Sequence, residues 1–435
     1  MRNRIVFLCS IFLLGVFARV AALPHDSAPR PGSDEDEYEA YAWNLAQGRG
    51  YRGPSPAYHD REHLTSWRMP GPSLMFAVVY KFVGRNPAAA AYTNIFISAA
   101  TCIPLFFIGC ALYGEIAGRI SSFVYALWPN AMFLSTHLLS EPLYVFLLTL
   151  YVAQTFALAR KPGVGNIAVN GLLLGALMYA RPHVFLLPFL FIWIVLVFWP
   201  HWRTMLACLS VFVVAALMLT PWVVRNYRVH GVFVPFTTQA GSALVDANNR
   251  IVATQPEYYG FALSWERSIP EYKDLYSSVT NEVQLSALGI TLYKQWMRQH
   301  PDKWWYLTES KFRRFWTPFL QQRNKFNRLV MLFSWGPVLI LFPIPFLASF
   351  WSGLRNHDPH VMVHFAILST LANSLFFGGI ARYRFPIEGF CIVFAAGAAL
   401  WLWNKLQPAL PGLTPKATAI CEQDKRIHEP VNPAT

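Results

Sequence analysis

Long apolar runs alternate with short polar connections along most of the chain. About ten runs of roughly 20 apolar residues predict membrane-spanning helices, because a helix of that length crosses the hydrocarbon core of a bilayer. The first predicted span follows Arg2 and Arg4 and covers residues 5–23. The others are residues 89–112, 117–138, 141–159, 164–180, 183–199, 204–224, 328–350, 360–380 and 385–404. The pattern predicts an all-α polytopic membrane protein with about ten transmembrane helices.

Two long segments, residues 24–88 and residues 226–327, are too polar to cross a membrane. Segments of this length with many aromatic residues are usually folded. Helical spacing predicts four short helices in them: Tyr38–Gln47, Pro72–Val83, Asn281–Gln299 and Pro301–Trp316. The second of these is apolar enough to lie along a membrane surface. We expect the two segments to pack together over the transmembrane bundle.

Basic residues in the short loops orient the predicted bundle. Alternation of the spans places one set of them on a common side: Arg119, Arg160, Lys161, Arg203, Arg355 and Lys405. Cytoplasmic loops carry such an excess of Lys and Arg, so both termini are expected in the cytoplasm and both polar segments on the external face. We therefore predict one transmembrane domain over residues 1–404, followed by a loose cytoplasmic tail over residues 405–435. A cleaved signal peptide over residues 1–23 is disfavoured because further spans follow it.

Composition supports a membrane protein and narrows its chemistry. Of the 435 residues, 54% are hydrophobic and only 14% charged, well below the roughly 25% charged residues of an average soluble domain. The net charge of +13 suits positive-inside loops, anionic headgroups or a phosphate-bearing substrate, and not a nucleic-acid-binding domain. The 6 cysteines and 12 histidines show neither a disulfide framework nor a convincing metal set. No metal site and no cofactor are predicted.

Carboxylates are scarce outside the two polar segments and the tail. Only four occur there: Glu115, Glu141, Asp358 and Glu388. Glu141 begins a predicted helix at its external end, where it could complement the helix dipole or face a cavity. Both interpretations stay open. Glu388 closely follows Arg382 and Arg384 and is interpreted as their charge partner.

The densest acidic cluster is Ser33-Asp34-Glu35-Asp36-Glu37-Tyr38, just before a predicted helix. A solvated acidic helix start is one interpretation. The other is catalytic, because carboxylates crowded near a membrane raise one another's pKa and suit a group that must accept a proton.

Five arginines lie at junctions on the same predicted face: Arg68, Arg181, Arg225, Arg382 and Arg384. Any one of them could snorkel to lipid phosphate. Together with the carboxylates they predict a cavity that holds a phosphate with fixed guanidinium groups beside a base. The sequence contains no phosphate-binding Gly-rich loop, no paired-histidine helix motif and no nucleophile elbow.

The order of these motifs resembles the membrane-embedded GT-C superfamily of polyprenyl-phosphate-dependent glycosyltransferases. Within it, the chain is most similar to the bacterial branch near the protein O-mannosyltransferases and the lipid A aminoarabinose transferases. The matching pieces are Asp34-Glu35 with Tyr38, the stretch Ala42 to Tyr51, Arg68-Met69-Pro70-Gly71, Leu139-Ser140-Glu141-Pro142-Leu143, Ala180-Arg181-Pro182, Pro221 to Tyr227, and Arg382-Tyr383-Arg384-Phe385-Pro386.

The resemblance implies roles for these residues. Asp34 matches the first-loop catalytic aspartate, with Asp36 as the alternative register, and Glu141 matches a second acidic position. Glu35 and Tyr38 are expected to contact substrate. The five arginines are expected to hold the donor phosphate. Pro72 and Ser73 replace an aromatic residue that usually follows the Arg-x-Pro-Gly unit, which changes the expected acceptor contacts.

The resemblance also implies an activity: transfer of a hexosyl or pentosyl unit from a polyprenyl-phosphate-linked donor, with inversion, at the external face of a bacterial inner membrane. The acceptor would be an envelope glycolipid, polysaccharide or protein. One alternative is a transporter or flippase of a lipid-linked sugar, although the chain lacks the obvious repeat common in transporters. The other is a non-catalytic scaffold for envelope assembly.

Overall fold

The computed structural model describes residues 2–24, 29–57, 62–183, 185–199, 201–318 and 325–406, except the side chains of residues 266 and 267. The described chain is helical and contains no strand, only one isolated bridge between Arg52 and Leu64. This confirms the predicted all-α class. Of the predicted tail, residues 405 and 406 still belong to the last helix, and residues 407–435 lie outside the described residues.

Seven helical units of the described chain are long and apolar enough to cross a membrane, by length and composition. They are α1 (Arg2–Ala21), α4–α5 (Pro87–Ala100 and Cys102–Tyr113), α8 (Glu141–Arg160), α11 (Trp202–His230), α18–α19 (Lys325–Leu341 and Pro343–Arg355), η3–α20 (Pro359–Val361 and Met362–Phe377) and α21 (Ala381–Leu406). The chain is thus a multi-pass membrane protein.

The other three predicted spans are helical but shorter than a full crossing. Residues 117–138 form α6 (Glu115–Ala126) and α7 (Pro129–Ser135), because Pro129 restricts the residue before it and begins a new helix. The remaining two form α9 (Val164–Ala180) of 17 residues and α10 (Leu186–Phe198) of 13 residues. The apolar pattern predicted helix correctly in all three segments. The bounds of α9 match the predicted span, whereas α10 is shorter than residues 183–199 and residues 117–138 are divided between two helices.

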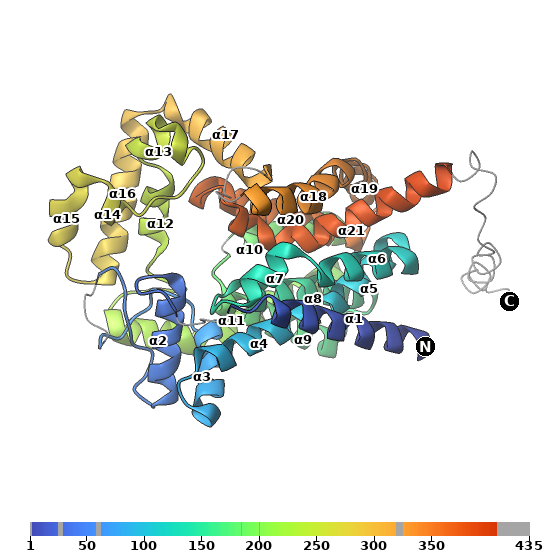
Figure 1. Ribbon diagram of the computed structural model, residues 1–435, viewed down its shortest axis with the longest axis horizontal. Helices are drawn as coiled ribbons and strands as arrows, with labels where there is room; N and C mark the ends of the chain where they lie inside the picture. The colour runs from blue at the N-terminus through green and yellow to red at the C-terminus, as the bar shows by residue number, and fades with distance from the viewer. Residues whose placement is uncertain are drawn as a thin grey trace.

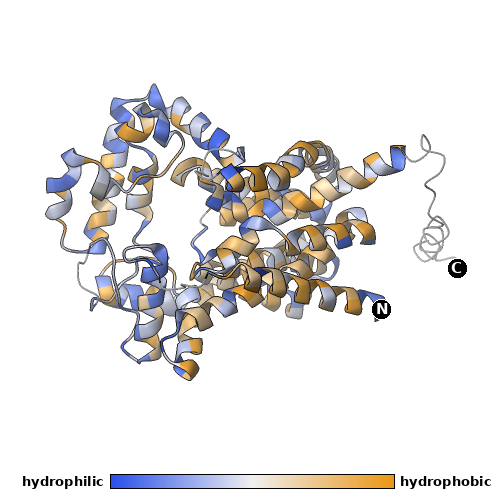
Figure 2. Ribbon diagram, in the orientation of Figure 1, coloured by the Kyte–Doolittle hydropathy of each residue, from blue (hydrophilic) through white to orange (hydrophobic). Residues whose placement is uncertain are grey.

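The two polar segments lie at one end of the apolar bundle, whereas the N-terminus and the end of α21 lie at the other (Figure 1). Figure 2 shows the mixed polar character of these segments against the orange bundle. The first contains α2 (Asp34–Ala46) and α3 (Gly71–Val83). The second contains α12 (Ala240–Ala247), α13 (Arg250–Thr254), η1 (Pro256–Tyr258), α14 (Trp265–Ser268), η2 (Pro270–Tyr272), α15 (Lys273–Ser277), α16 (Glu282–Gln299) and α17 (Lys303–Trp316). All four helices predicted in these segments are present.

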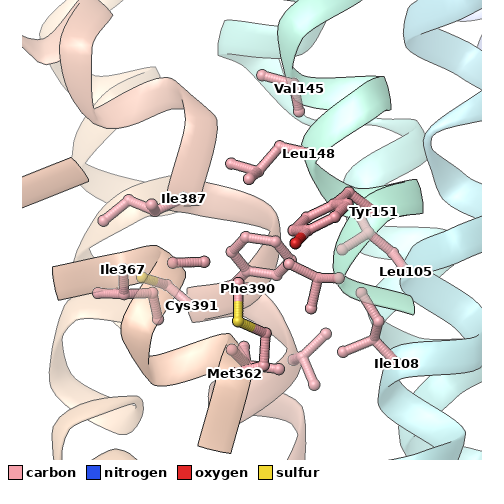
Figure 3. Close-up of a cluster of buried hydrophobic side chains, with 14 of the residues drawn as sticks. Leu105, Ile108, Val145, Leu148, Tyr151, Met362, Ile367, Ile387, Phe390 and Cys391 are labelled. Atoms are coloured by element: carbon pink, nitrogen blue, oxygen red, sulfur yellow. The ribbon is translucent and has the colours of Figure 1, made fainter. Parts of the chain in front are cut away.

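Apolar side chains from α5, α8, α20 and α21 form the centre of the bundle (Figure 3). Leu105, Leu148, Met362 and Phe390 are fully buried there. This core packs α8 against α21. Glu141 and Arg382 lie in the first turns of these two helices.

Glu282 at the start of α16 joins the two polar segments. Its fully buried carboxylate accepts hydrogen bonds from the backbone N–H of Ser66 at 2.9 Å and from the Thr238 hydroxyl at 2.9 Å. The hydroxyl of Thr65 donates to it as well. Trp67 packs beside this network in one apolar cluster with Trp265 and Leu285. The two polar segments therefore pack together, as predicted.

We expect Glu282→Gln to lower the free energy of unfolding by about 1–3 kcal/mol, because a neutral amide replaces a charged acceptor that serves three donors. Thermal unfolding in detergent and limited proteolysis of residues 226–327 measure the loss. Glu309→Gln is the matched control, since Glu309 forms an ion pair with the largely exposed Arg313 on the surface of the protein. Equal shifts in both variants would contradict this role for Glu282.

Candidate functional site

The start of α2 separates the acids of the 34–37 cluster. Ser33 is the N-cap, and its hydroxyl accepts a hydrogen bond from the Asp36 N–H at 3.4 Å. The Asp36 carboxylate turns back and accepts from the Gly32 N–H at 3.0 Å. Asp34 instead lines a cavity. The cap thus gives the two aspartates different surroundings, which the sequence alone left open.

A continuous ion-pair network joins Asp34 to Glu141. The Asp34 carboxylate pairs with Arg68 at 2.6 Å and with Arg382 at 2.7 Å. Arg382 also donates from its Nε to Glu141, which pairs with Arg181 at 2.7 Å. These five residues come from α2, the loop before α3, the start of α8, the end of α9 and the start of α21. Arg382 therefore bridges the two carboxylates.

This network borders a cavity of about 360 Å³. Asp34, Arg68, Arg181 and Arg382 form its charged wall. Neutral residues complete the lining, among them Tyr38, His183, Phe236, Gln239, Asn373, Phe377 and Tyr383. The cavity thus combines fixed guanidinium groups with an uncharged wall.

Two glycine positions bring the arginines to the cavity. A Cβ on Gly71 would lie 2.6 Å from the carbonyl oxygen of Tyr179, so only glycine lets the Arg68 loop approach the end of α9. Gly378 has φ +115°, a backbone conformation that favours glycine, in the turn before α21. This turn leads into the first helical turn of α21, where Arg382 lies.

The two carboxylates beside Arg68 differ in pKa. Burial by itself would raise the pKa of Asp34, but the guanidinium groups of Arg68 and Arg382 hold it well below its usual range. Burial raises the pKa of Glu37 to about 7, and Arg68, at 2.6 Å, offsets only part of this effect. Glu37 shares one guanidinium with Asp34 and also experiences its negative charge. Near neutral pH, Asp34 is ionised while Glu37 titrates.

We expect stability to fall as the pH rises from about 4.5 to about 7, by at most about 3 kcal/mol from Glu37. The folded state holds the Glu37 proton above its ordinary pKa of 4.5, so this contribution is complete below pH 4.5 and is lost as the pH passes 7. Unfolding curves of the wild type and Glu37→Gln measure it. The variant should show a flatter pH dependence in this window, and identical profiles would contradict the assignment.

Three of the predicted site residues make their hydrogen bonds away from this cavity. Arg225 donates to the backbone oxygens of Thr65 at 2.7 Å and Tyr51 at 3.0 Å, beside a separate, mainly apolar groove. Glu35 accepts from the Leu138 N–H at 3.4 Å. The third is Arg384, whose partners are Glu388 and Phe315. The remaining predicted residues, Asp34, Tyr38, Glu141, Arg68, Arg181 and Arg382, lie in or directly behind the cavity wall.

Arg384 is fully buried on another face of α21. It pairs with Glu388 at 2.8 Å and donates to the backbone oxygen of Phe315 at 2.6 Å. Side chains two positions apart on a helix point in nearly opposite directions, so Arg382 and Arg384 contact different parts of the protein. The predicted charge pairing of Glu388 is confirmed for Arg384 and is wrong for Arg382, whose partners are Asp34 and Glu141.

The sequence interpretation missed several cavity residues. His183 follows Arg181 by two positions, and Tyr383 lies between two arginines that were singled out. Asn373 is a lone amide in an apolar span, a pattern that often marks a polar contact inside a membrane bundle. Gln239, whose side-chain oxygen accepts from Arg68 at 3.4 Å, has no such signal.

That the protein has no metal site and no cofactor stays a prediction. Within the described ranges, no group of three or more His, Cys, Asp or Glu side chains is arranged to hold a metal ion. Asp34 and Glu141 are each paired with two guanidinium groups.

Solved membrane transferases have a similar structure. The apo oligosaccharyltransferase of Archaeoglobus fulgidus matches 97% of this chain and 52% of its own length, with a TM-score of 0.59 and 13% identity. The AglB oligosaccharyltransferase of that organism, in complex with an inhibitory peptide and a dolichol-phosphate, matches 97% of this chain and 54% of its own, with a TM-score of 0.55 and 12% identity.

ArnT from Cupriavidus metallidurans, bound to undecaprenyl phosphate, matches 95% of this chain and 81% of its own at a TM-score of 0.43 and 13% identity. No protein-family model and no curated protein matches the sequence. The chain spans about half the length of the oligosaccharyltransferases. At these identities the likeness concerns the fold.

Proposed function

The chain has the GT-C-type fold of these membrane transferases, and on that premise we propose that it transfers a sugar from a polyprenyl-phosphate-linked donor to an acceptor hydroxyl. One observation carries the proposal: Arg382 bridges Asp34 and Glu141 at the wall of a cavity next to the polar segments. The archaeal relative with this fold was solved with a dolichol-phosphate, a lipid phosphate of the proposed donor class.

Asp34 is the proposed general base. As the acceptor oxygen bonds to the anomeric carbon, its proton passes to the Asp34 carboxylate, and the bond from that carbon to the phosphate oxygen breaks with its electron pair. Arg68, Arg181 and Arg382 stabilise the phosphate anion that leaves. A single displacement inverts the anomeric configuration.

Donor binding would activate this base. In the structure, Arg68 and Arg382 both stabilise the ionised form of Asp34 and make it a weak base. A phosphate that draws on the same two guanidinium groups removes part of that stabilisation, so the pKa of Asp34 rises when the donor is in place. The Asp34 carboxylate therefore becomes a stronger base only when the donor is bound.

Glu141 has a positioning role in this proposal. It is fully buried behind the cavity wall and holds Arg181 and Arg382 through ion pairs. Tyr38 remains a proposed substrate contact because its side chain lines the cavity. Arg225, Arg384 and Glu35 are left out of the proposed donor site, since their hydrogen bonds lie elsewhere.

We place the reaction at the external face of a bacterial inner membrane, with both termini in the cytoplasm. The donor carries a hexosyl or pentosyl unit, and the acceptor is an envelope glycolipid, polysaccharide or protein. A mass-spectrometric comparison of envelope glycans and glycolipids with and without the gene tests the function. The deletion strain should lack one sugar unit, and the wild-type gene should restore it. An unchanged glycan and glycolipid profile would overturn the proposal.

A further inference from the structure

His183 lies between α9 and α10 and lines the same cavity, where it is only 5% exposed. Its Nδ1 forms a hydrogen bond with the hydroxyl of Tyr144, and the two rings lie edge to face with centroids 5.0 Å apart. Nothing in the proposed mechanism uses this pair. A buried polar pair at a cavity wall is arranged either to fill space or to present its free atom to a ligand.

The surroundings of Tyr144 assign the tautomer of His183. Tyr144 is fully buried, and within the described chain its hydroxyl has His183 as its only hydrogen-bond partner. If Nδ1 carried the proton, the Tyr144 hydroxyl proton would be buried without an acceptor, at a cost of about 1–3 kcal/mol. Tyr144 therefore donates to Nδ1, and the proton of the neutral ring is on Nε2.

Nε2 is the atom available to the cavity. The Nε2 atom has no hydrogen-bond partner among the described residues. It is also not completely enclosed by the protein, so a ligand can reach it. Burial, with a smaller effect of Arg181, lowers the pKa of His183 to about 3. The ring stays neutral across roughly pH 5–8, where an ordinary histidine titrates. The cavity thus contains a permanent, uncharged N–H donor.

The charges around the cavity are already matched. Asp34 and Glu141 are each paired with two guanidinium groups, so neither carboxylate is free for the ammonium of an amino sugar. Arg68 also pairs with Glu37, so Arg68, Arg181 and Arg382 are already shared among three carboxylates before a donor phosphate binds, which leaves no cation for a sugar carboxylate. The neutral wall also carries the Asn373 amide, which forms no hydrogen bond with another described residue.

We infer that the transferred sugar is uncharged and that Nε2–H of His183 donates to one of its hydroxyl or ring oxygens. His183 is then a specificity-determining residue that contacts the sugar and not the phosphate, and Tyr144 fixes its tautomer. This inference rests on the proposed function and names the substrate class for that site.

The first test separates sugar contact from phosphate contact. His183→Phe keeps a ring of similar size without an N–H, and His183→Gln keeps a side-chain N–H donor. In the deletion strain we expect the phenylalanine variant to restore the missing sugar unit at a rate lower by about tenfold or more, and the glutamine variant to restore most of the rate. Binding of undecaprenyl phosphate to the purified proteins, followed by tryptophan fluorescence, should be unchanged in both.

Three results would overturn the inference: wild-type transfer by His183→Phe, a matching loss of undecaprenyl phosphate binding, or a missing sugar unit whose mass identifies an amino sugar or a uronic acid. The last result leaves the proposed glycosyl transfer intact. Conversely, a deletion strain with no missing unit removes the proposed function itself.

The second test does not depend on activity. In ¹⁵N-histidine-labelled protein, the resonances absent from His183→Phe should report an Nε2–H tautomer that does not titrate between roughly pH 5 and 8. Tyr144→Phe should alter those resonances because the Nδ1 partner is lost. A titrating ring or an Nδ1–H tautomer would contradict the assigned hydrogen bond.

Discussion

Asp34→Asn is expected to lower the rate of sugar transfer in membranes at least about 100-fold, the lower end of the usual contribution of a general base. An amide has the shape of the carboxylate but accepts no proton at neutral pH. Its oxygen still accepts a hydrogen bond from Arg68 or Arg382, so the fold should persist. Initial rates at matched protein levels measure the effect, and thermal unfolding verifies the fold.

Asp36→Asn is the matched control for this prediction. It makes the same exchange two residues along α2, at a carboxylate that accepts from the Gly32 N–H and does not line the cavity. We expect less than about a threefold change in rate, because the Asp36 carboxylate does not line the cavity in which the reaction is proposed. Near wild-type turnover of Asp34→Asn, or a larger loss in Asp36→Asn, would remove Asp34 as the base.

Arg382→Ala is expected to weaken binding of the donor phosphate about 10- to 100-fold, because charge-assisted hydrogen bonds contribute about 1.5–3 kcal/mol each. The change in acceptor KM should be smaller, since the acceptor hydroxyl approaches Asp34. The variant also leaves the buried Glu141 with Arg181 alone, so a stability loss of about 3–5 kcal/mol should accompany it. Titration with undecaprenyl phosphate and thermal unfolding measure the two effects.

Two further variants sharpen the Arg382 prediction. Arg382→Lys keeps the charge but not the planar fork that serves Asp34 and Glu141 together, so it should recover only part of the affinity. Arg313→Ala removes a largely exposed arginine of α17 and should change neither binding nor stability appreciably. Equal losses of donor and acceptor binding in Arg382→Ala would count against a phosphate role for this residue.

Sequence patterns predicted the helical class and the positions of the elements well, because hydrophobic length and helical spacing are local properties. The helices at Asp34–Ala46 and Glu282–Gln299 begin within a few residues of their predicted starts. Helix length was less predictable. The run over residues 117–138 is apolar enough to be predicted as one span, yet Pro129 divides it, because proline restricts the backbone of the residue before it.

The sequence indicated some of the site residues but could not distinguish between neighbouring candidates. Scarcity of carboxylates singled out Glu141, crowding singled out the 34–37 cluster, and Arg382 was one of five arginines at span junctions. An ionisable residue near a membrane requires a partner or a cavity. The same reasoning could not separate Arg382 from Arg384, or Asp34 from Asp36. Those distinctions depend on how α21 is rotated and on which way the cap of α2 turns each carboxylate.

By itself, the sequence determined that this protein is a helical membrane protein and that its rare charges gather at helix ends. Only the tertiary structure decided which of those charges meet. Arg382 is 241 positions from Glu141 along the chain, yet it bridges that residue and Asp34. Likewise, no local pattern indicates that Tyr144 assigns a tautomer to His183. Contacts of this kind arise when packed helices bring distant side chains within hydrogen-bond distance, and that geometry is not written in any one segment.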